Sequence, residues 1–489
     1  MKPPMPRLSG SLSSHILGHL GDLGAFSLVL DPAGERAKAG GLTYRLHQRL
    51  PGWYDETSSK TFRLNAAGAT IVYTKDPLVY KEILGPNQKH FTNGDAFRKT
   101  LGYLIPQSMI VIEGDQWTRV RKVATRAMAR QMIDELPVTV GETLDKLLHV
   151  PDAATENGSP VAPLQLDPAE LFTRASFDIF HKIMYKWDPD TASSNSEALE
   201  LLNSAIVCTG AVGDRVLLPF EWLWRLPLPS NRRIDAARDA MRAKTTSLIH
   251  ARMATLTNAD VESLDLSLLD AMIVAASEGK LSEKELIDQV QTFFFGAFDT
   301  TSHTVAILLN HLAHNSRVQD TLRAELYEAF PGGYKTIPTL EVLDQCAYLT
   351  HVLNESMRLT PFAVAIARTC VAPCTIHGYS FDKGSQVIVD CSEASKDPAN
   401  YPGQADLDEF RPERFDEVRF DKTVTLPFGF GGRICPGRKI ALGELKAMCA
   451  YVVMGWKLSR QPNVPFLMDM TLGLNMREGH GMLNWESIK

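Results

Sequence analysis

The sequence predicts one mainly α-helical domain that carries a small β-rich lobe. Apolar residues recur at helical spacing through a long middle segment, about residues 115–360, which polar loops interrupt near 151–160 and 189–197. Two segments of alternating polarity, near 61–74 and 375–389, lie outside it and read as strands. No internal repeat or low-complexity linker divides the chain. These observations favour a single large fold.

The β-rich lobe is expected to contain two hairpins. Residues 61–64 and 70–74 alternate around the turn sequence Asn65-Ala66-Ala67-Gly68. Residues 375–381 and 386–389 flank Asp382-Lys383-Gly384 in the same manner. We therefore expect each pair of segments to form antiparallel neighbours.

Domain organisation follows from the same pattern. We expect one domain over residues 1–489, although a prior of about 150 residues per domain would suggest three. Residues 1–40 form a lead segment, and its Pro-rich start is not a signal peptide. No run of 18 uncharged apolar residues occurs, so no transmembrane anchor is expected in this chain. Either the native protein is soluble or the chain begins after a removed anchor.

Composition excludes several classes of function. Hydrophobic residues make up 44% of the chain and charged residues 22%, which allows a large core and argues against disorder. The net charge of -6 gives no overall basic field, so nucleic acid is not an expected partner. The 7 cysteines are scattered, which favours a reducing compartment. Cys370 and Cys374 form a C-x-x-x-C pair without a second pair, so we expect no zinc site.

One helix start is well marked in the middle segment. Ser282 and Glu285 fit a capping box, in which each side chain satisfies a free backbone amide at the helix start. The pattern predicts a long helix that runs to Asn315. Gly296 interrupts its bulky apolar run at a cost of about 1 kcal/mol relative to Ala, so a packing or ligand reason is expected.

The sharpest motif is the glycine-rich loop FGFGGRICPG at residues 428–437, which leads into a predicted helix from Lys439 to Tyr451. Glycines allow close backbone approach and positive φ values. Amides at the following helix start favour the thiolate form of Cys435, so this residue can act as an anionic metal ligand. A lone C-P-G would more often be a structural turn with a buried cysteine. Five fixed residues at this spacing are expected by chance in only about one chain in ten thousand of this length.

This loop resembles the haem-binding loop of the cytochromes P-450, whose pattern is F-x-x-G-x-R-x-C-x-G. The resemblance implies the cytochrome P-450 fold and a haem b (iron protoporphyrin IX) cofactor. Cys435 would then be the axial iron ligand, with Phe428, Arg433 and Gly437 as cofactor-binding residues. A thiolate ligand in this family favours O–O cleavage.

Two further motifs match the same family. Glu355-x-x-Arg358 alone is more often a plain ion pair on a helix. With Arg414, in Phe410-Arg-Pro-Glu-Arg-Phe415, it matches the family's buried triad behind the haem loop, which serves folding and haem retention.

Basic residues suggest two kinds of site. Trp117, Arg121 and Arg368 match the family's clamps for the haem propionates, since a guanidinium binds a carboxylate through two hydrogen bonds; the alternative is surface salt bridges. A basic stripe is usually only solvated, but here it resembles a docking surface for an acidic reductase. The docking residues are expected to be Arg119, Lys122, Arg126, Arg438, Lys439 and Lys446.

The long helix resembles the family's oxygen-activating segment. Asp299 and Thr300 match its acid-alcohol pair, and Ala297 departs from the commoner Gly while remaining small. Thr300 can simply bond the carbonyl four residues back, which is common for mid-helix threonine. Over a haem, it can instead bond oxygen while Asp299 relays protons from solvent. We favour this second interpretation.

Position relative to these motifs predicts an apolar substrate pocket, as is usual for ligand sites. Core packing is the competing interpretation for each of its aromatic residues. The expected pocket residues are Ile110, Phe293, Ala297, Phe298, Val364 and Leu474.

The expected function is a haem-thiolate monooxygenase that acts as a monomer on an apolar small molecule, with specialised metabolites among the candidates. Electrons would come from NADPH through a separate NADPH-cytochrome reductase, because 489 residues leave no room for a fused flavin domain. Oxidative coupling or rearrangement on the same scaffold, and a non-enzymatic haem sensor, remain as alternatives.

The chain's location is expected from two further features. Aromatic residues at 220–224 beside Arg225 suit a membrane surface, although core packing suits them equally. The Pro-rich start resembles the hinge of microsomal members. We therefore expect the cytosolic face of the endoplasmic reticulum, with the cytoplasm as the alternative.

Overall fold

The computed structural model describes most of the chain, and the lead segment lies almost entirely outside the described part. The described residues are 5–7, 42–66, 69–128, 131–148, 163–193, 195–216, 221–257, 266–334, 339–417, 423–462, 464, 467–476 and 480–488.

Helices make up the larger part of the described chain, as expected. The α-helices are α4 (Leu42–Thr57), α5 (Pro77–Leu84), α6 (Asp95–Leu104), α7 (Gly114–Ala127), α8 (Gln131–Asp134), α9 (Leu136–Leu148), α10 (Pro168–Tyr185), α11 (Ser196–Arg215), α12 (Pro229–Thr255), α14 (Leu268–Ser277), α15 (Glu283–His314), α16 (Ser316–Ala329), α17 (Leu340–Gln345), α18 (Ala347–Leu359), α19 (Cys391–Ala394), α20 (Arg414–Glu417) and α21 (Arg438–Gly455).

The strands form small sheets. Their bounds are β1 (Thr61–Ala66), β2 (Ala69–Thr74), β3 (Phe91–Asn93), β4 (Leu164–Leu166), β5 (Ala365–Cys370), β6 (Cys374–Ile376), β7 (Tyr379–Phe381), β8 (Gln386–Asp390), β9 (Trp456–Arg460), β10 (Met468–Met470), β11 (Leu474–Met476) and β12 (Leu483–Ser487).

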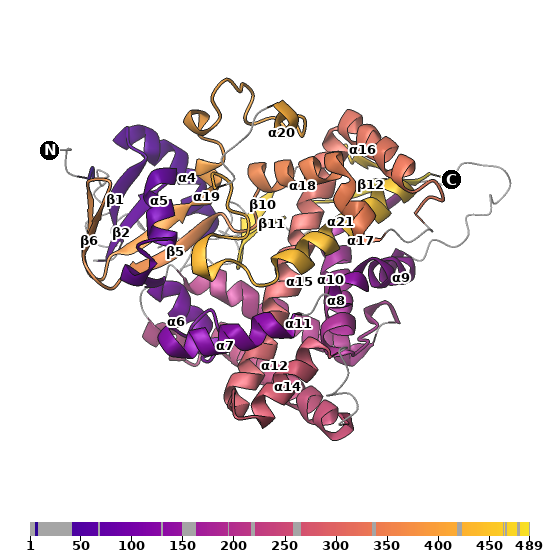
Figure 1. The fold of residues 1–489 in the computed structure, drawn as a ribbon, viewed down its shortest axis with the longest axis horizontal. Helices are drawn as coiled ribbons and strands as arrows, with labels where there is room; N and C mark the ends of the chain where they lie inside the picture. The colour runs from indigo at the N-terminus through magenta and orange to yellow at the C-terminus, as the bar shows by residue number, and fades with distance from the viewer. Residues whose placement is uncertain are drawn as a thin grey trace.

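The main sheet has five strands in the order β1-β2-β8-β5-β3. Its β1–β2 pair is antiparallel with Thr61 opposite Thr74, which confirms the first predicted hairpin. β8 lies parallel to β2 and antiparallel to β5. In Figure 1 this lobe lies on the upper left, and the helical body fills the right and the bottom of the view.

The second predicted hairpin is wrong in its pairing. β6 pairs with β7 across a turn at His377 and Gly378, both of which have positive φ values. Two successive residues with positive φ match the right-handed twist of a hairpin. The following strand, β8, therefore leaves this pair and joins the main sheet.

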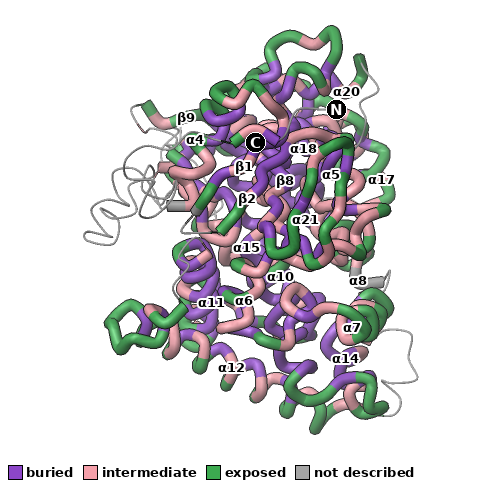
Figure 2. Tube along the Cα trace, turned by 90° about the vertical axis from the view of Figure 1, so that its left-hand side faces the viewer, coloured by how far each residue is buried: buried purple, intermediate pink, exposed green. Residues whose placement is uncertain are grey.

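α15 is the central helix of the body. Ser282 and Glu285 form the predicted capping box, and the helix ends at His314, one residue before the expected Asn315. α15 packs against α10, α12, α18 and α21. Figure 2 shows that buried residues gather around α10 and α15 in the interior. Across the described ranges, no helix combines the length and apolar character needed to span a membrane.

Candidate active site

The loop before α21 presents Cys435 from a rigid backbone. The Cys435 amide donates to the Phe428 carbonyl at 2.8 Å, which closes the loop on itself. Gly429 and Gly431 have φ values of 78° and 73°, in the left-handed region that disfavours other residues. A Cβ on Gly431 would lie 1.9 Å from the Leu84 carbonyl oxygen, so this glycine allows the loop to pack directly on the end of α5.

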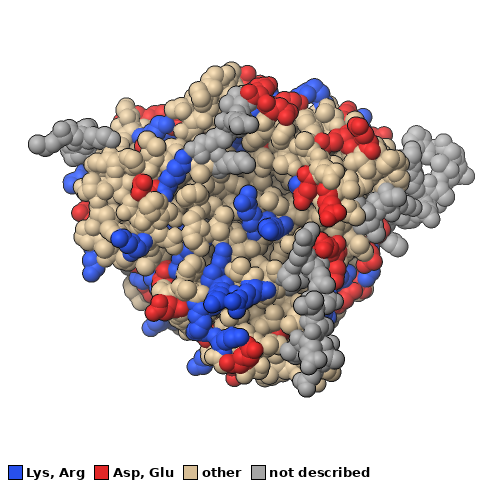
Figure 3. All heavy atoms as spheres, in the orientation of Figure 1, with Lys and Arg blue, Asp and Glu red and all other residues tan. Residues whose placement is uncertain are grey.

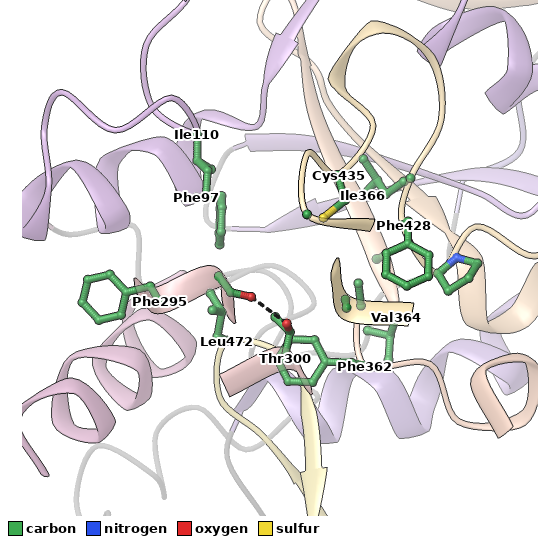
Figure 4. A pocket seen from close by; sticks show the side chains of 18 of the residues that line it. Phe97, Ile110, Phe295, Thr300, Phe362, Val364, Ile366, Phe428, Cys435 and Leu472 are labelled. Atoms are coloured by element: carbon green, nitrogen blue, oxygen red, sulfur yellow. Dashed lines mark hydrogen bonds between the residues drawn. The ribbon is translucent and has the colours of Figure 1, made fainter. Parts of the chain in front are cut away.

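Cys435 faces a large cavity between the β lobe and α15. The cavity has a volume of about 600 Å³ and reaches from Cys435 to Thr300 on α15. Figure 4 shows these two side chains on opposite sides of the same space, with Phe362 and Val364 beside Thr300. The volume lies within the range of about 300–1,000 Å³ that is typical of ligand sites.

The cavity wall near Cys435 carries a surplus of positive charge. Arg121, Arg368 and Arg433, three of the expected cofactor-binding residues, all line the cavity. Arg433 pairs with Glu113 and lies over the Trp117 ring, 4.3 Å from its centroid. The other two guanidinium groups bond only to backbone carbonyls among the described residues: Arg121 to Ile434 at 2.7 Å and Arg368 to Ala367 at 2.9 Å.

Burial makes these charges costly. It lowers the pKa of Arg368 to about 10, and the nearby positive charge of Arg433 acts in the same direction. Burial also lowers the pKa of Arg121 and of Arg433. Buried charges require compensation, and Glu113 is the only carboxylate of the described residues that pairs with any of these three arginines. The wall therefore suits a ligand with negatively charged groups.

The electrostatics of Cys435 differ from the expectation. Burial raises the pKa of its thiol, although the Gly437 amide and the Arg121 guanidinium favour the thiolate. In the protein alone, the effect of burial on this pKa is therefore larger than the opposite effect of the amides at the start of α21. A metal cation at the sulfur deprotonates a coordinating thiol outright, so the amides and Arg121 act as supporting groups for that state.

Small residues of α15 form the opposite wall. Gly296 and Ala297 line the cavity, and open space lies where a Gly296 side chain would project. Thr300 lines it too, and its hydroxyl donates to the Gly296 carbonyl at 2.6 Å, as the dashed line in Figure 4 shows. The alternative interpretation of Thr300, a bond to the carbonyl four residues back, therefore describes this structure. Its oxygen can still accept a hydrogen bond from the cavity.

Asp299 lies behind this wall. It is buried and does not line the cavity. The Nε2 atom of His303 lies 3.6 Å from its Oδ1 atom. The predicted acid thus points away from the cavity, toward a histidine that the sequence analysis did not single out.

Four of the six expected pocket residues line the cavity: Ile110, Phe293, Ala297 and Val364. Phe298 and Leu474 do not, so their assignment was wrong. Phe298 stacks on Phe294 within the core, with 5.0 Å between ring centroids. Leu474 pairs with Met470 in the β10–β11 hairpin and is buried in a separate cluster with Ile307. Cavity residues that the sequence analysis missed include Phe97, Phe180, Phe295, Thr301 and Thr304.

The predicted triad is present and fully buried. Arg358 donates to both carboxylate oxygens of Glu355 at 2.7 and 2.9 Å, and Arg414 donates to Oε1 at 2.7 Å. All three side chains are 0% exposed. The remaining donors bond to backbone carbonyls, including those of Ser395 and Leu407, and to the side-chain oxygen of Gln404. This full pairing is what buried charges require.

The expected docking residues divide into two groups. Lys122, Arg126, Arg438 and Lys439 are exposed. Figure 3 shows basic side chains gathered on this face of the molecule, in the region of α7. Arg119 is exposed but pairs with Glu285 at 2.6 Å. Lys446 is buried and pairs with Asp344 at 2.7 Å, so it does not belong to an open basic surface.

Glu113 is the main site residue that the sequence analysis missed. One of its oxygens accepts a hydrogen bond from the backbone N–H of Asn93 at 2.9 Å, and the other pairs with Arg433. It therefore joins β3, the start of α7 and the Cys435 loop. No local motif marks it, because its partners are far away in the sequence.

A cavity that sets a cysteine and a cationic wall against the small residues Gly296 and Ala297 of α15 is suited to haem-thiolate oxygen chemistry. The family model for cytochrome P450 matches residues 44–485. The chain is 27% identical over 424 residues to cytochrome P450 3A29 of Sus scrofa, covering 83% of this chain and 81% of that protein. It is 25% identical over 416 residues to cytochrome P450 3A5 of Homo sapiens, covering 83% and 80%. It is 23% identical over 439 residues to the chloroplastic protein LUTEIN DEFICIENT 5 of Arabidopsis thaliana, covering 86% and 71%.

The chain therefore belongs to the cytochrome P450 family, the haem-thiolate monooxygenases. Membership implies a haem iron cofactor, and the residues present fit one. The under-compensated arginines match its carboxylates, and Cys435 supplies the thiolate that the iron requires.

Proposed function

We propose that this monooxygenase inserts one atom of O2 into an apolar small-molecule substrate, by hydroxylation or a related oxidation, with haem b as cofactor and NADPH as electron source through a separate reductase. The cavity that places Cys435 opposite Thr300 carries this proposal. Its substrate side is lined by aromatic and aliphatic residues, which favours an apolar ligand.

Each wall of the cavity has its own task in this proposal. Cys435 binds the haem iron, while Arg121, Arg368 and Arg433, with Trp117, bind and orient the haem carboxylates. When bound, the haem iron supplies the activation of O2 and the oxidation of the substrate. Thr300 and Asp299 deliver protons to the space beside the small residues of α15.

The reductase would dock on the exposed basic residues around the Cys435 loop. Lys122 and Arg126 extend from α7, and Arg438 and Lys439 begin α21 directly after that loop. A positively charged surface steers an acidic partner and orients it. These four residues, which we call the basic docking surface, replace the six expected from sequence.

Membrane contact is the proposed basis for location at the endoplasmic reticulum. Trp222, Leu226 and Leu228 are 61%, 38% and 47% exposed. Arg225 and Arg232 beside them are also exposed. Exposed aromatic and aliphatic side chains among arginines suit the interface of a membrane with anionic lipids. Flotation with anionic vesicles tests this proposal. If Trp222→Ser floated with the vesicles to the same extent as the wild type, membrane contact at this segment would be contradicted.

The decisive first experiment is the spectrum of the reduced protein with carbon monoxide. The red-shifted Soret band of thiolate ligation is expected, and its absence would overturn the role of Cys435. A binding screen of apolar compounds, specialised metabolites among them, then follows shifts of the Soret band to find a substrate. Turnover with NADPH, a reductase and ¹⁸O2 should give a product that carries one labelled oxygen.

The turnover experiment with NADPH, a reductase and ¹⁸O2 also separates the alternatives. Oxidative coupling would consume NADPH and O2 without labelling the product, and rearrangement of a peroxide would need neither. A haem sensor would bind the ligand without turnover. Any of these three results would replace oxygen insertion as the function.

A further inference from the structure

Asp299, the acid of the proposed proton-delivery pair, is enclosed by protein. Its side chain is 5% exposed, and it does not line the cavity. Its Oδ2 atom forms no hydrogen bond with any residue of the described part of the chain. Buried carboxyl groups normally have partners, so a neighbouring side chain must fix this one and offset its charge.

His303 is placed to do so. It lies one helical turn after Asp299, so the two side chains share a face of α15. Its Nε2 atom lies 3.6 Å from Oδ1, within ion-pair range. Over the described ranges, no other Lys, Arg or His lies within 4.0 Å of this carboxylate.

The orientation of the His303 ring is fixed by the cavity wall. The ring lies parallel to that of Phe362, with 6.2 Å between centroids and 8° between planes. Phe362 is itself held in place: its carbonyl accepts the Leu474 amide at 2.8 Å, and a Cβ on Gly473 would come within 2.4 Å of its ring. Phe362 lines the cavity beside Thr300 (Figure 4). The histidine thus connects Asp299 to a rigid part of the substrate site.

We propose that His303 is a positioning residue for proton delivery, an inference that rests on the monooxygenase function proposed above. His303 holds Oδ1 of Asp299, which leaves Oδ2 as the oxygen that exchanges protons. The step moves one proton and no electrons. The Oδ2–H bond breaks and its proton passes through water to the Thr300 hydroxyl, because no described residue bonds Oδ2 directly. The Thr300 hydroxyl releases its own proton into the cavity, and the carboxylate anion is stabilised by the His303 ring.

Two variants and a matched control test this role. His303→Phe keeps a flat ring against Phe362 but removes both nitrogens, and His303→Gln keeps a hydrogen-bond donor. His351 provides the control, because it also pairs with a carboxylate, Asp416 at 3.5 Å, and stacks on Phe415, which unlike Phe362 does not line the cavity. The proteins are compared with a reductase and NADPH but without substrate, by hydrogen peroxide released per NADPH consumed.

The expected result is specific to proton delivery. His303→Phe should keep the normal carbon monoxide spectrum. The share of NADPH-derived electrons that reduces O2 to water, rather than to hydrogen peroxide, should fall about tenfold. That loss is smaller than the about 10²-fold effect expected for removal of a proton donor itself. His303→Gln should release less hydrogen peroxide per NADPH than His303→Phe, and His351→Phe should match the wild type. Normal coupling in His303→Phe would overturn the inference while leaving the monooxygenase function intact.

A second measurement does not depend on activity. Long-range ¹H–¹⁵N spectra of the reduced, carbon monoxide-bound protein with ¹⁵N-labelled histidine report the protonation of each ring nitrogen. The signal that His303→Gln removes belongs to His303, one of 13 histidines. Asp299→Asn should shift that signal, and an unchanged signal would refute the pairing even if no substrate were known.

Discussion

The Nε atom of Arg414 lies 2.7 Å from Oε1 of Glu355, and neither side chain has any exposed surface. The same oxygen also accepts the backbone amide of Arg411 at 3.0 Å. Glu355 thereby joins α18 to the segment that leads to the Cys435 loop, although 59 positions separate it from Arg414. Its single carboxylate pairs with two buried guanidinium groups.

Glu355→Ala should abolish stable haem incorporation. The change leaves Arg358 and Arg414 buried without a carboxylate, and breaking a buried pair in this way costs about 3–5 kcal/mol. The measurement is haem content after purification, with the unfolding midpoint of the protein. Glu417→Ala, which removes the exposed partner of Arg411, is the control and should retain haem. Normal holoprotein from Glu355→Ala would refute the structural role of the triad.

Thr300→Ala should keep the haem but divert electrons from NADPH to hydrogen peroxide. The variant loses the hydroxyl that residue 300 presents at the cavity wall, while the bond to Gly296 that it also loses is local to the helix. General acid-base groups contribute about 10²–10⁴-fold, so a fall in coupled product of about 10²-fold is expected. Thr300→Ser retains the hydroxyl and should remain coupled. Unchanged coupling in the alanine variant with a true substrate would exclude the proton-delivery role.

Much of the site could be predicted because its residues occur in fixed local patterns. The Cys435 loop and Glu355-x-x-Arg358 are short motifs with a chemical reason for each spacing. The error at Phe298 was avoidable in principle. Phe293, Ala297, Thr300 and Thr304 are three or four positions apart and share the cavity face, whereas Phe298 follows Ala297 by one position and belongs to another face.

Long-range pairing could not be predicted in the same way. The role of Glu113 depends on Arg433, which lies 320 positions later, and no pattern near Glu113 indicates that partner. The second hairpin failed because Asp382-Lys383-Gly384 is the stronger turn sequence, while the actual turn uses His377 before Gly378. Lys446 was expected on an open basic surface because lysine side chains are usually exposed. Only the packing of α17 against α21 shows that it pairs with Asp344.

Asp390 should make the folded protein less stable as the pH rises. Burial raises its pKa from 3.8 to about 7, and the carboxyl group is 1% exposed. Because the folded chain then binds the proton more tightly than the unfolded chain, this contribution is complete below about pH 4 and is lost as the pH approaches 7. The slope is about 1.4 kcal/mol per pH unit.

Asp390→Asn removes this titration and retains the oxygen that caps α19 at Glu393. Denaturant unfolding at pH 5 and pH 7.5 should therefore show a smaller loss of stability in the variant than in the wild type. Asp408→Asn, at an exposed site, is the control. Equal pH dependence in the Asp390 variant and the wild type would show that the carboxyl group titrates normally.

Asp288 should restrain the loop of residues 107–112, of which Met109 and Ile110 line the cavity. It is fully buried, its Oδ2 accepts the Gln107 amide at 2.7 Å, and its Oδ1 pairs with Arg242 of α12 at 2.7 Å. Asp288→Ala should accelerate hydrogen exchange at residues 107–112 by about tenfold or more, because loss of a buried hydrogen-bond partner costs about 1–3 kcal/mol. Asp239→Ala, which removes an exposed partner of Arg238 on α12, should change the exchange at residues 107–112 little. Unaltered exchange in 107–112 would show that other contacts hold the loop.

Charge reversal should separate the basic docking surface from a structural lysine. Lys122→Glu and Lys439→Glu should slow association with an acidic reductase by about tenfold at low salt, and the difference should vanish at high salt. Their stability should remain normal because both side chains are exposed. Lys446→Glu should instead lower the unfolding midpoint at every salt concentration, since the new carboxylate would face Asp344 in a buried position. Stopped-flow reduction and thermal unfolding distinguish the two behaviours. Salt-independent effects of Lys122→Glu and Lys439→Glu would place the reductase on a different face.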